Sequence, residues 1–62
     1  MNQQWIIEVL DGNEPAYVTE HRGELYLTQY RRIAARFPTE LDAKCTKVYI
    51  PDKYQPRIVS DS

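Results

Sequence analysis

Cysteine, histidine, glycine and serine are all scarce in this chain of 62 residues, and each scarcity excludes a class of protein. Cys45 is the one cysteine, so the chain cannot form a disulfide within itself. Small secreted domains are usually stapled by about two to four disulfides, which makes the cytoplasm the expected compartment. Without staples, a domain this short depends on well-formed local structure or on association, and a second copy of the chain is one such partner.

The side chains needed for catalysis and metal binding are also few. His21 is the single histidine, and the serines Ser60 and Ser62 fall in a C-terminal tail that we expect to fray. One cysteine and one histidine cannot complete the four ligands of a zinc site, and two glycines are too few for a glycine-rich phosphate loop. We therefore expect that the protein is not an enzyme and needs no metal or other cofactor.

Long hydrophobic runs and an excess of one charge are missing as well. The apolar runs Trp5–Ile7 and Val48–Ile50 are far shorter than the roughly 20 residues that cross a bilayer, so no membrane association is expected. No basic segment precedes the first apolar run, which argues against a signal peptide. Eight Lys plus Arg against nine Asp plus Glu give a net charge of −1, which argues against a dedicated polyanion binder.

What the chain does have begins with three strand-like segments. Over residues 5–10, an apolar face of Trp5, Ile7 and Val9 alternates with a second face that is only partly apolar, and turn-forming residues follow around Gly12. Residues 16–20 are rich in β-formers, and Gly23 separates them from a further strand over 24–28. This spacing predicts three antiparallel strands joined by short turns.

Residues 28–37 fit two structures. As a helix, this segment would place Tyr30, Ile33 and Phe37 on one stripe, and as a strand it would alternate apolar and basic side chains. We favour a strand, or a bulged strand, that continues from the third strand. The helix remains the alternative because arginine and alanine favour helix.

A helix is expected after Pro38. Thr39 is a good N-cap, and Glu40 and Lys44 form a favourable pair one turn apart. The apolar residues at helical spacing share one face, which we expect to be buried: Leu41, Cys45, Val48 and Tyr49. There Cys45 would be an inert core thiol and not the partner of His21 in a catalytic pair.

A short final strand is expected over 57–59, at a sheet edge because Pro56 adjoins it. The expected fold is α+β: a single domain over 1–62 in which a small antiparallel sheet of three to four strands packs on one α-helix, in the order β-β-β-α-β. Such a sheet keeps one face and one edge open, so association with a partner or with a second copy is expected.

Basic and aromatic residues cluster in the middle of the chain. The candidate partner-binding residues are Arg31, Arg32, Arg36, Tyr26 and Tyr30, with Arg22 as a further neighbour. Tyrosine and arginine are enriched at interface hot spots, and the same pair can grip phosphate and stack on bases. Three interpretations stay open: a solvated face that protects a sheet edge, a site for an acidic protein, and a less favoured site for nucleic acid.

The aromatic residues outnumber what a core this small can bury. Trp5, Phe37 and Tyr49 are the best candidates for the core. At least one of the remaining tyrosines Tyr26, Tyr30 and Tyr54 should then be exposed.

The run from Arg32 to Ala43 (RIAARFPTELDA) resembles a pattern of small bacteriophage and prophage proteins. In those proteins a hairpin that starts near a Trp leads to a basic strand ending in Ala-x-x-Phe and then to a Thr- or Ser-capped helix. Residues 5–43 follow this outline. The resemblance implies a small protein that acts in the cytoplasm of a bacterial host and blocks or redirects a host protein complex, as anti-CRISPR and other anti-defence or transcription inhibitors do.

Our leading hypothesis is therefore a non-enzymatic, phage-type inhibitor of a host protein complex. One alternative is a small nucleic-acid-binding regulator that uses Arg31, Arg32 and Arg36. The other is a structural or assembly protein of the phage particle.

Overall fold

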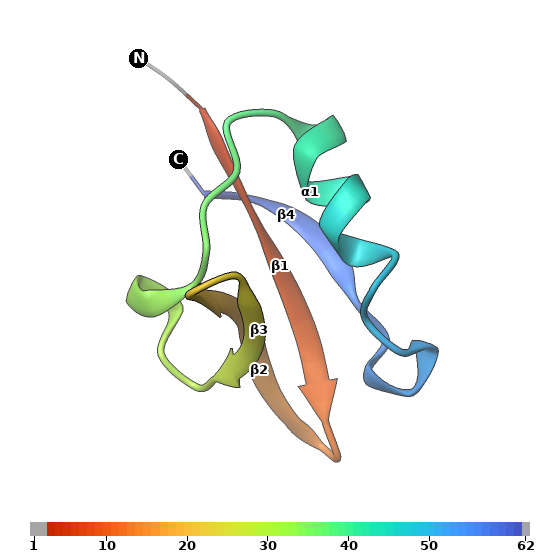
Figure 1. Ribbon diagram of the computed structural model, residues 1–62. Coiled ribbons are helices and arrows are strands. Elements are labelled where there is room, and N and C mark those ends of the chain that lie inside the picture. Colours follow the sequence, from red (N-terminus) through yellow and green to blue (C-terminus); the bar gives the residue numbers. More distant parts are fainter. Residues whose placement is uncertain (1–2, 62) are drawn as a thin grey trace.

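Four strands and one helix make up the computed structural model, which describes residues 3–61 (Figure 1). Its elements, in chain order, are β1 (Gln4–Asp11), β2 (Glu14–His21), β3 (Glu24–Thr28), the 3₁₀ turn η1 (Arg31–Ile33), α1 (Glu40–Lys47), the 3₁₀ turn η2 (Asp52–Tyr54) and β4 (Arg57–Asp61). The strands form one antiparallel sheet in the order β3-β2-β1-β4. The expected α+β fold with the order β-β-β-α-β is therefore confirmed.

Two tight turns connect the first three strands. Gly12 has a φ of 68° and Gly23 a φ of 79°, both in the left-handed region that glycine tolerates. Arg22 also has a positive φ, of 52°, so both central residues of the β2–β3 turn are left-handed, as in a type I′ turn. Such turns match the right-handed twist of the paired strands. The two-residue turn also sets the register of the β2–β3 pair, in which Thr19 lies opposite Tyr26.

The chain between η1 and α1 fills a gap in the sheet. Four residue pairs join β1 to β2, all close to their shared turn, and beyond them the two strands separate. In the gap, the Ala35 N–H donates to the Val18 carbonyl at 2.9 Å. Trp5 and Phe37 exchange backbone hydrogen bonds at 2.9 and 2.8 Å.

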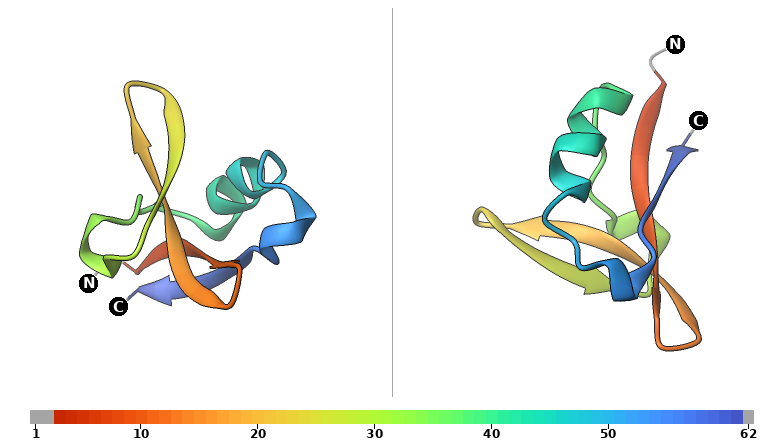
Figure 2. Two further views of the ribbon diagram at one scale, coloured as in Figure 1. Left: turned by 90° about the horizontal axis from the view of Figure 1, so that it is seen from below. Right: turned by 90° about the vertical axis from the view of Figure 1, so that its right-hand side faces the viewer.

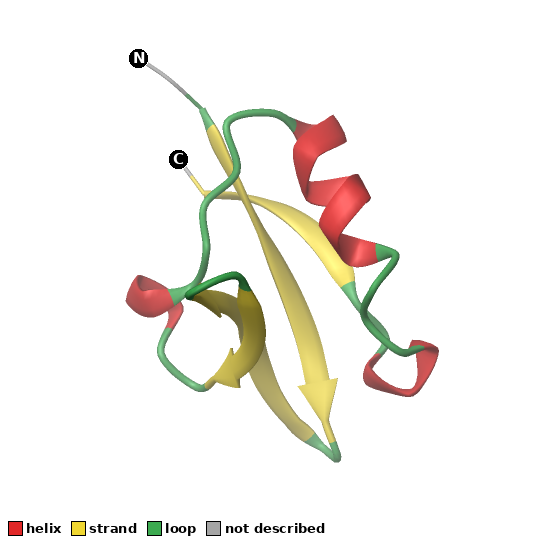
Figure 3. Cartoon of the chain, viewed as in Figure 1, coloured by secondary structure: helices red, strands yellow, loops and turns green. Residues whose placement is uncertain are grey.

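The strand expected over residues 28–37 is therefore wrong for most of that segment. The chain leaves β3 after Thr28, makes the turn η1 and returns to the sheet at Ala35 and Phe37 (Figure 3). A regular strand would have carried the chain away from the sheet. The turn instead reverses it, which brings it across one sheet face to the gap between β1 and β2.

Apolar side chains are buried on both faces of the sheet. On the face that α1 covers, the core comprises Ile7, Val9, Ala16, Val18, Ala43 and Ile50. On the other face, Ile6 is fully buried, as is Ala34 in the segment that follows η1. Among the expected core aromatics, Trp5 and Phe37 are partly buried against the core, whereas Tyr49 is exposed, so that part of the expectation is wrong.

Helix α1 begins as expected but buries the opposite face. The Thr39 hydroxyl accepts a hydrogen bond from the Asp42 N–H at 3.0 Å, which confirms the N-cap, and Lys44 pairs with Glu40 at 3.3 Å. Ala43 is fully buried and faces the sheet, whereas Leu41 is 68% exposed. The α1 helix is also too short and too polar to span a membrane, and the described residues hold no other candidate helix.

The expected buried helix face is therefore wrong: Leu41, Cys45, Val48 and Tyr49 are all exposed. The physical reason is distance. A helix can lie close to β1 and β4 when it presents a small residue, and Ala43 serves this contact better than a stripe of large side chains. Cys45 is thus not the inert core thiol expected from the pattern.

Strand β4 lies at the edge of the sheet, as expected, but extends further than 57–59. Ser60 pairs with Trp5 and Asp61 pairs with Gln4, so the expected fraying is wrong for these two residues. Ser62 lies outside the described residues. Side-chain contacts from the η1 segment hold this end of β4 in place, and they belong to the site described next.

Candidate functional site

The structure brings most of the candidate partner-binding residues to one side of the sheet. Tyr26 lies on β3 and faces away from α1, because it alternates with Leu25, which packs against the α1-side core. Tyr30 precedes η1, Arg31 and Arg32 belong to it, and Arg36 follows it. Arg22 is not brought to this cluster, because the β2–β3 turn lies at the far end of β3 from η1.

Two of the arginines are fixed by the end of β4. Arg36 Nε donates to Asp61 Oδ2 at 2.7 Å, and Arg31 Nε lies 3.4 Å from Asp61 Oδ1. Arg31 also donates to the Ser60 carbonyl at 3.3 Å and lies over the Tyr17 ring, 5.9 Å from its centre. One carboxylate thus joins two guanidinium groups that come from separate parts of the η1 segment.

Arg36 also stabilises η1 itself. Its guanidinium donates to the carbonyls of Arg32 at 3.0 Å and Ala34 at 3.1 Å, which are among the backbone acceptors that a short helix cannot satisfy internally. The Thr19 hydroxyl donates to the Ile33 carbonyl at 2.8 Å from the sheet below. Contacts from Thr19 on β2 and from Asp61 on β4 therefore hold η1 in place, although η1 is only three residues long.

The contact with the two arginines lowers the pKa of Asp61. The hydrogen bond from Arg36 is the main reason why the pKa of Asp61 lies below its usual value, and the charge of Arg36 and contacts with Arg31 lower it further. Partial desolvation of the carboxylate opposes this shift. Asp61 is therefore ionised at neutral pH and neutralises part of the positive charge of the cluster.

Aromatic and aliphatic side chains are exposed around these arginines. Tyr30 is 61% exposed, Ile33 49% and Tyr26 48%. Tyr26 lies beside Ile33, because Tyr26 is opposite Thr19 in the sheet and the Thr19 hydroxyl binds the Ile33 backbone. We call the side chains of Tyr26, Tyr30, Arg31, Arg32, Ile33 and Arg36 the η1 surface.

The polar side chains of the η1 surface differ in whether they already have a hydrogen-bond or ion-pair partner within the chain. Arg32 is exposed, and its side chain forms no hydrogen bond or ion pair with any residue in 3–61. The Tyr26 hydroxyl donates to Glu24 at 2.6 Å, and this bond raises the pKa of Tyr26. The cation of this surface that is open to a partner is therefore Arg32.

Ile33 is the member of this surface that sequence reasoning did not select. Its signal was present, because the helix interpretation placed Ile33 on one stripe with Tyr30. That helix was only the alternative to the favoured strand, and Ile33 was not assigned to a surface. In the structure, Tyr30 and Ile33 are exposed and contribute to the η1 surface, whereas Phe37 packs against the core.

Comparison with family models, curated proteins and solved structures found no significant match.

Outside the η1 surface, the reactive side chains of the described residues do not cluster. Residues 3–61 hold no group of three or more His, Cys, Asp or Glu side chains that could bind a metal ion. His21 is exposed at the end of β2, and Cys45 is exposed on α1. No hydrogen bond joins these two side chains within the described range.

Proposed function

We propose that this chain is a non-catalytic, phage-type protein that binds a host protein complex through the η1 surface and inhibits or redirects it by covering part of it. The observation that carries this proposal is the exposure of Tyr30, Ile33 and Tyr26 around arginines that Asp61 and backbone carbonyls hold fixed. Tyrosine and arginine dominate interface hot spots. Side chains that are already ordered also lose less entropy on binding.

The composition of the η1 surface indicates the chemistry of its partner. The exposed rings of Tyr26 and Tyr30 with Ile33 fit an apolar depression. Arg32, which extends beside them, fits a carboxylate at the rim of that depression. The partner is thus expected to present an apolar patch flanked by an acidic residue.

A protein partner is favoured over nucleic acid by the charges on this face. Asp61 lies between Arg31 and Arg36, and Arg57 is paired with Glu8. Binding of a polyanion depends on the number of cations that can neutralise phosphates, and most of these cations already have a carboxylate partner.

The test starts with a tagged chain used to capture proteins from a bacterial lysate, with identification by mass spectrometry. Binding to the purified partner is then compared among the unchanged chain, Tyr30→Ala, Arg32→Glu and the control Lys53→Glu. Lys53 lies in η2, next to Tyr54 of the α1-side core, and is therefore away from the η1 surface. We expect each η1 variant to weaken binding by about tenfold or more and the control to bind as the unchanged chain does.

Three outcomes would contradict the proposal. Equal binding by all variants would show that another surface makes the contact. Retention of nucleic acid in place of protein, with an affinity that falls steeply as salt rises, would favour the nucleic-acid regulator. Large regular assemblies of the purified chain would favour a structural protein of the particle.

A further inference from the structure

The face of the sheet opposite the η1 surface is only half covered. Helix α1 packs on β1 and β4, which form one half of the sheet (Figure 2). On the other half, the side chains of Val18, Leu25 and Leu27 point to the same face. Leu25 and Leu27 are incompletely buried, so no helix within residues 3–61 fully covers the apolar side chains of this half.

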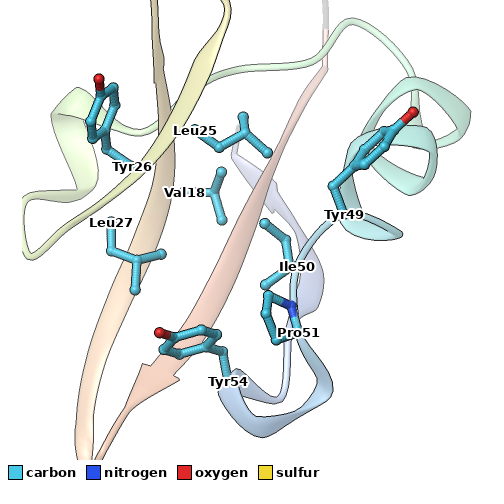
Figure 4. A pocket seen from close by; sticks show the side chains of 8 residues that line it. All are labelled: Val18, Leu25, Tyr26, Leu27, Tyr49, Ile50, Pro51 and Tyr54. Carbon is cyan, nitrogen blue, oxygen red and sulfur yellow. The ribbon is translucent and has the colours of Figure 1, made fainter.

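An apolar groove occupies this uncovered half. Two neighbouring hollows of about 300 and 340 Å³ share Leu25 and Tyr49 in their linings, and together we call them the groove. Val18, Leu25 and Leu27 line the groove on the sheet side, and Tyr49, Ile50, Pro51 and Tyr54 line it on the side of α1 and η2 (Figure 4). Tyr26 borders the same hollow, but its ring points away from Val18 (Figure 4). Glu20 and Thr46 line the far end of the groove.

Next to the groove, α1 presents an apolar ridge. Successive residues of a helix are about 100° apart, so Leu41, Cys45 and Val48 point away from the buried Ala43. All three are exposed, Val48 to 78%. We call Leu41, Cys45 and Val48 the α1 ridge. Tyr49 lies between the ridge and the groove and is likewise 78% exposed.

We propose that a second copy of the chain fills the groove with its α1 ridge, and that the contact is reciprocal. In this dimer the α1-bearing faces of the two sheets face each other, and the two-fold axis runs between them, parallel to α1. The rotation places the ridge of each copy over the groove of the other. This arrangement is closed, because each copy contributes one ridge and one groove. It would also supply the helix that the β2–β3 half of the sheet lacks.

The charges at the groove support this occupant. Under such an axis every residue stays at the same height along the helix. Glu20 and Thr46 line one hollow, and Lys44 lies half a turn before Thr46. Beside the ridge, Lys44 projects on the side away from Tyr49, and in the dimer this side faces the β2–β3 hairpin of the other copy. Lys44 lies 3.3 Å from Glu40 in the single chain and is 61% exposed, so the partner's Lys44 would meet Glu20 at the rim of the groove while it stays close to its own Glu40.

The test is the mass of the chain in solution over a wide range of concentration, by sedimentation velocity. We expect a reversible dimer of the 7.3 kDa chain. Val48→Glu puts a charge on an exposed residue of the ridge, so it should leave the fold intact and raise the dissociation constant by about tenfold or more. The control Arg32→Glu changes charge on the opposite sheet face and should leave the dimer unchanged.

A charge exchange tests the orientation of the two copies. Glu20→Lys and Lys44→Glu should each weaken the dimer, and the two changes together should restore it, with circular dichroism to confirm that each variant is folded. A chain that stays monomeric at every concentration, a dimer that is indifferent to Val48→Glu, or a double variant no tighter than the singles would each overturn the proposal. Binding through the η1 surface is measured separately, so failure of one proposal leaves the other standing.

Discussion

The orientation of α1 makes a sharp prediction about two neighbouring positions. Leu41 looks like a core residue in the sequence but is 68% exposed, and Ala43 looks neutral but is fully buried. We therefore predict that Leu41→Ala has little effect on stability, whereas Ala43→Leu destabilises the fold.

The magnitudes follow from burial. Full burial of a leucine side chain is worth about 1.5–3 kcal/mol, so the buried third of Leu41 contributes roughly 0.5–1 kcal/mol, and the higher helix propensity of alanine offsets part of this. If Leu41 were a core residue, the same truncation would cost about 2–5 kcal/mol. At Ala43 the added carbons would force α1 away from β1 and β4, for which a cost of about 1–3 kcal/mol is typical.

The assay is urea unfolding followed by circular dichroism, at concentrations low enough that association does not contribute. In a thermal melt of the same chains, a loss of 1 kcal/mol should appear as a fall in Tm of roughly 4–8 °C for a domain of this size. The reasoning is refuted if Leu41→Ala is the more damaging change, because the helix would then bury the stripe and expose Ala43.

Two further predictions concern local contacts. The pKa of Asp61 is lower in the folded chain, chiefly because of Arg36, so its contribution to stability is complete above the unfolded value of about 3.9 and is lost as pH falls through the folded value. Asp61→Asn should thus reduce the free energy of unfolding at neutral pH but not at a pH below both values, and parallel pH curves for the two chains would contradict this. Arg22→Asn should raise the free energy of unfolding by about 0.5–1 kcal/mol, since asparagine followed by Gly23 suits a type I′ turn better than a left-handed arginine, and an unchanged urea midpoint would count against the turn assignment.

Features that depend on neighbouring residues could be predicted from the sequence. Glycine marked both tight turns because it adopts positive φ at little cost, and Thr39 marked the start of α1 because its hydroxyl satisfies a backbone donor nearby. The order of elements along the chain, β-β-β-α-β, followed from these short turns together with the capped helix. Each of these signals acts over a few residues, so no knowledge of the tertiary structure was needed.

The buried face of α1 could not be predicted, because an apolar stripe on a helix has the same spacing whether it packs in the core or is exposed on the surface. Leu41 and Val48 satisfy the pattern of a core face, and the sheet instead accepts Ala43. The fixation of Arg31 and Arg36 escaped prediction for another reason. It depends on Asp61, which is brought to η1 only once β4 has paired with β1.

The η1 surface and the α1 ridge lie on opposite faces of the sheet, and this arrangement determines how the two proposals combine. A dimer formed through the ridges would keep both η1 surfaces exposed, directed away from each other. Such a dimer can bind two sites of a multisubunit complex, and the second contact then forms at a high effective concentration. Val48→Glu should therefore weaken binding to a densely immobilised partner but leave the affinity for a single copy of that partner in solution unchanged. Equal losses in both formats would mean that Val48 contacts the partner directly, and the α1 ridge would then belong to the partner-binding surface.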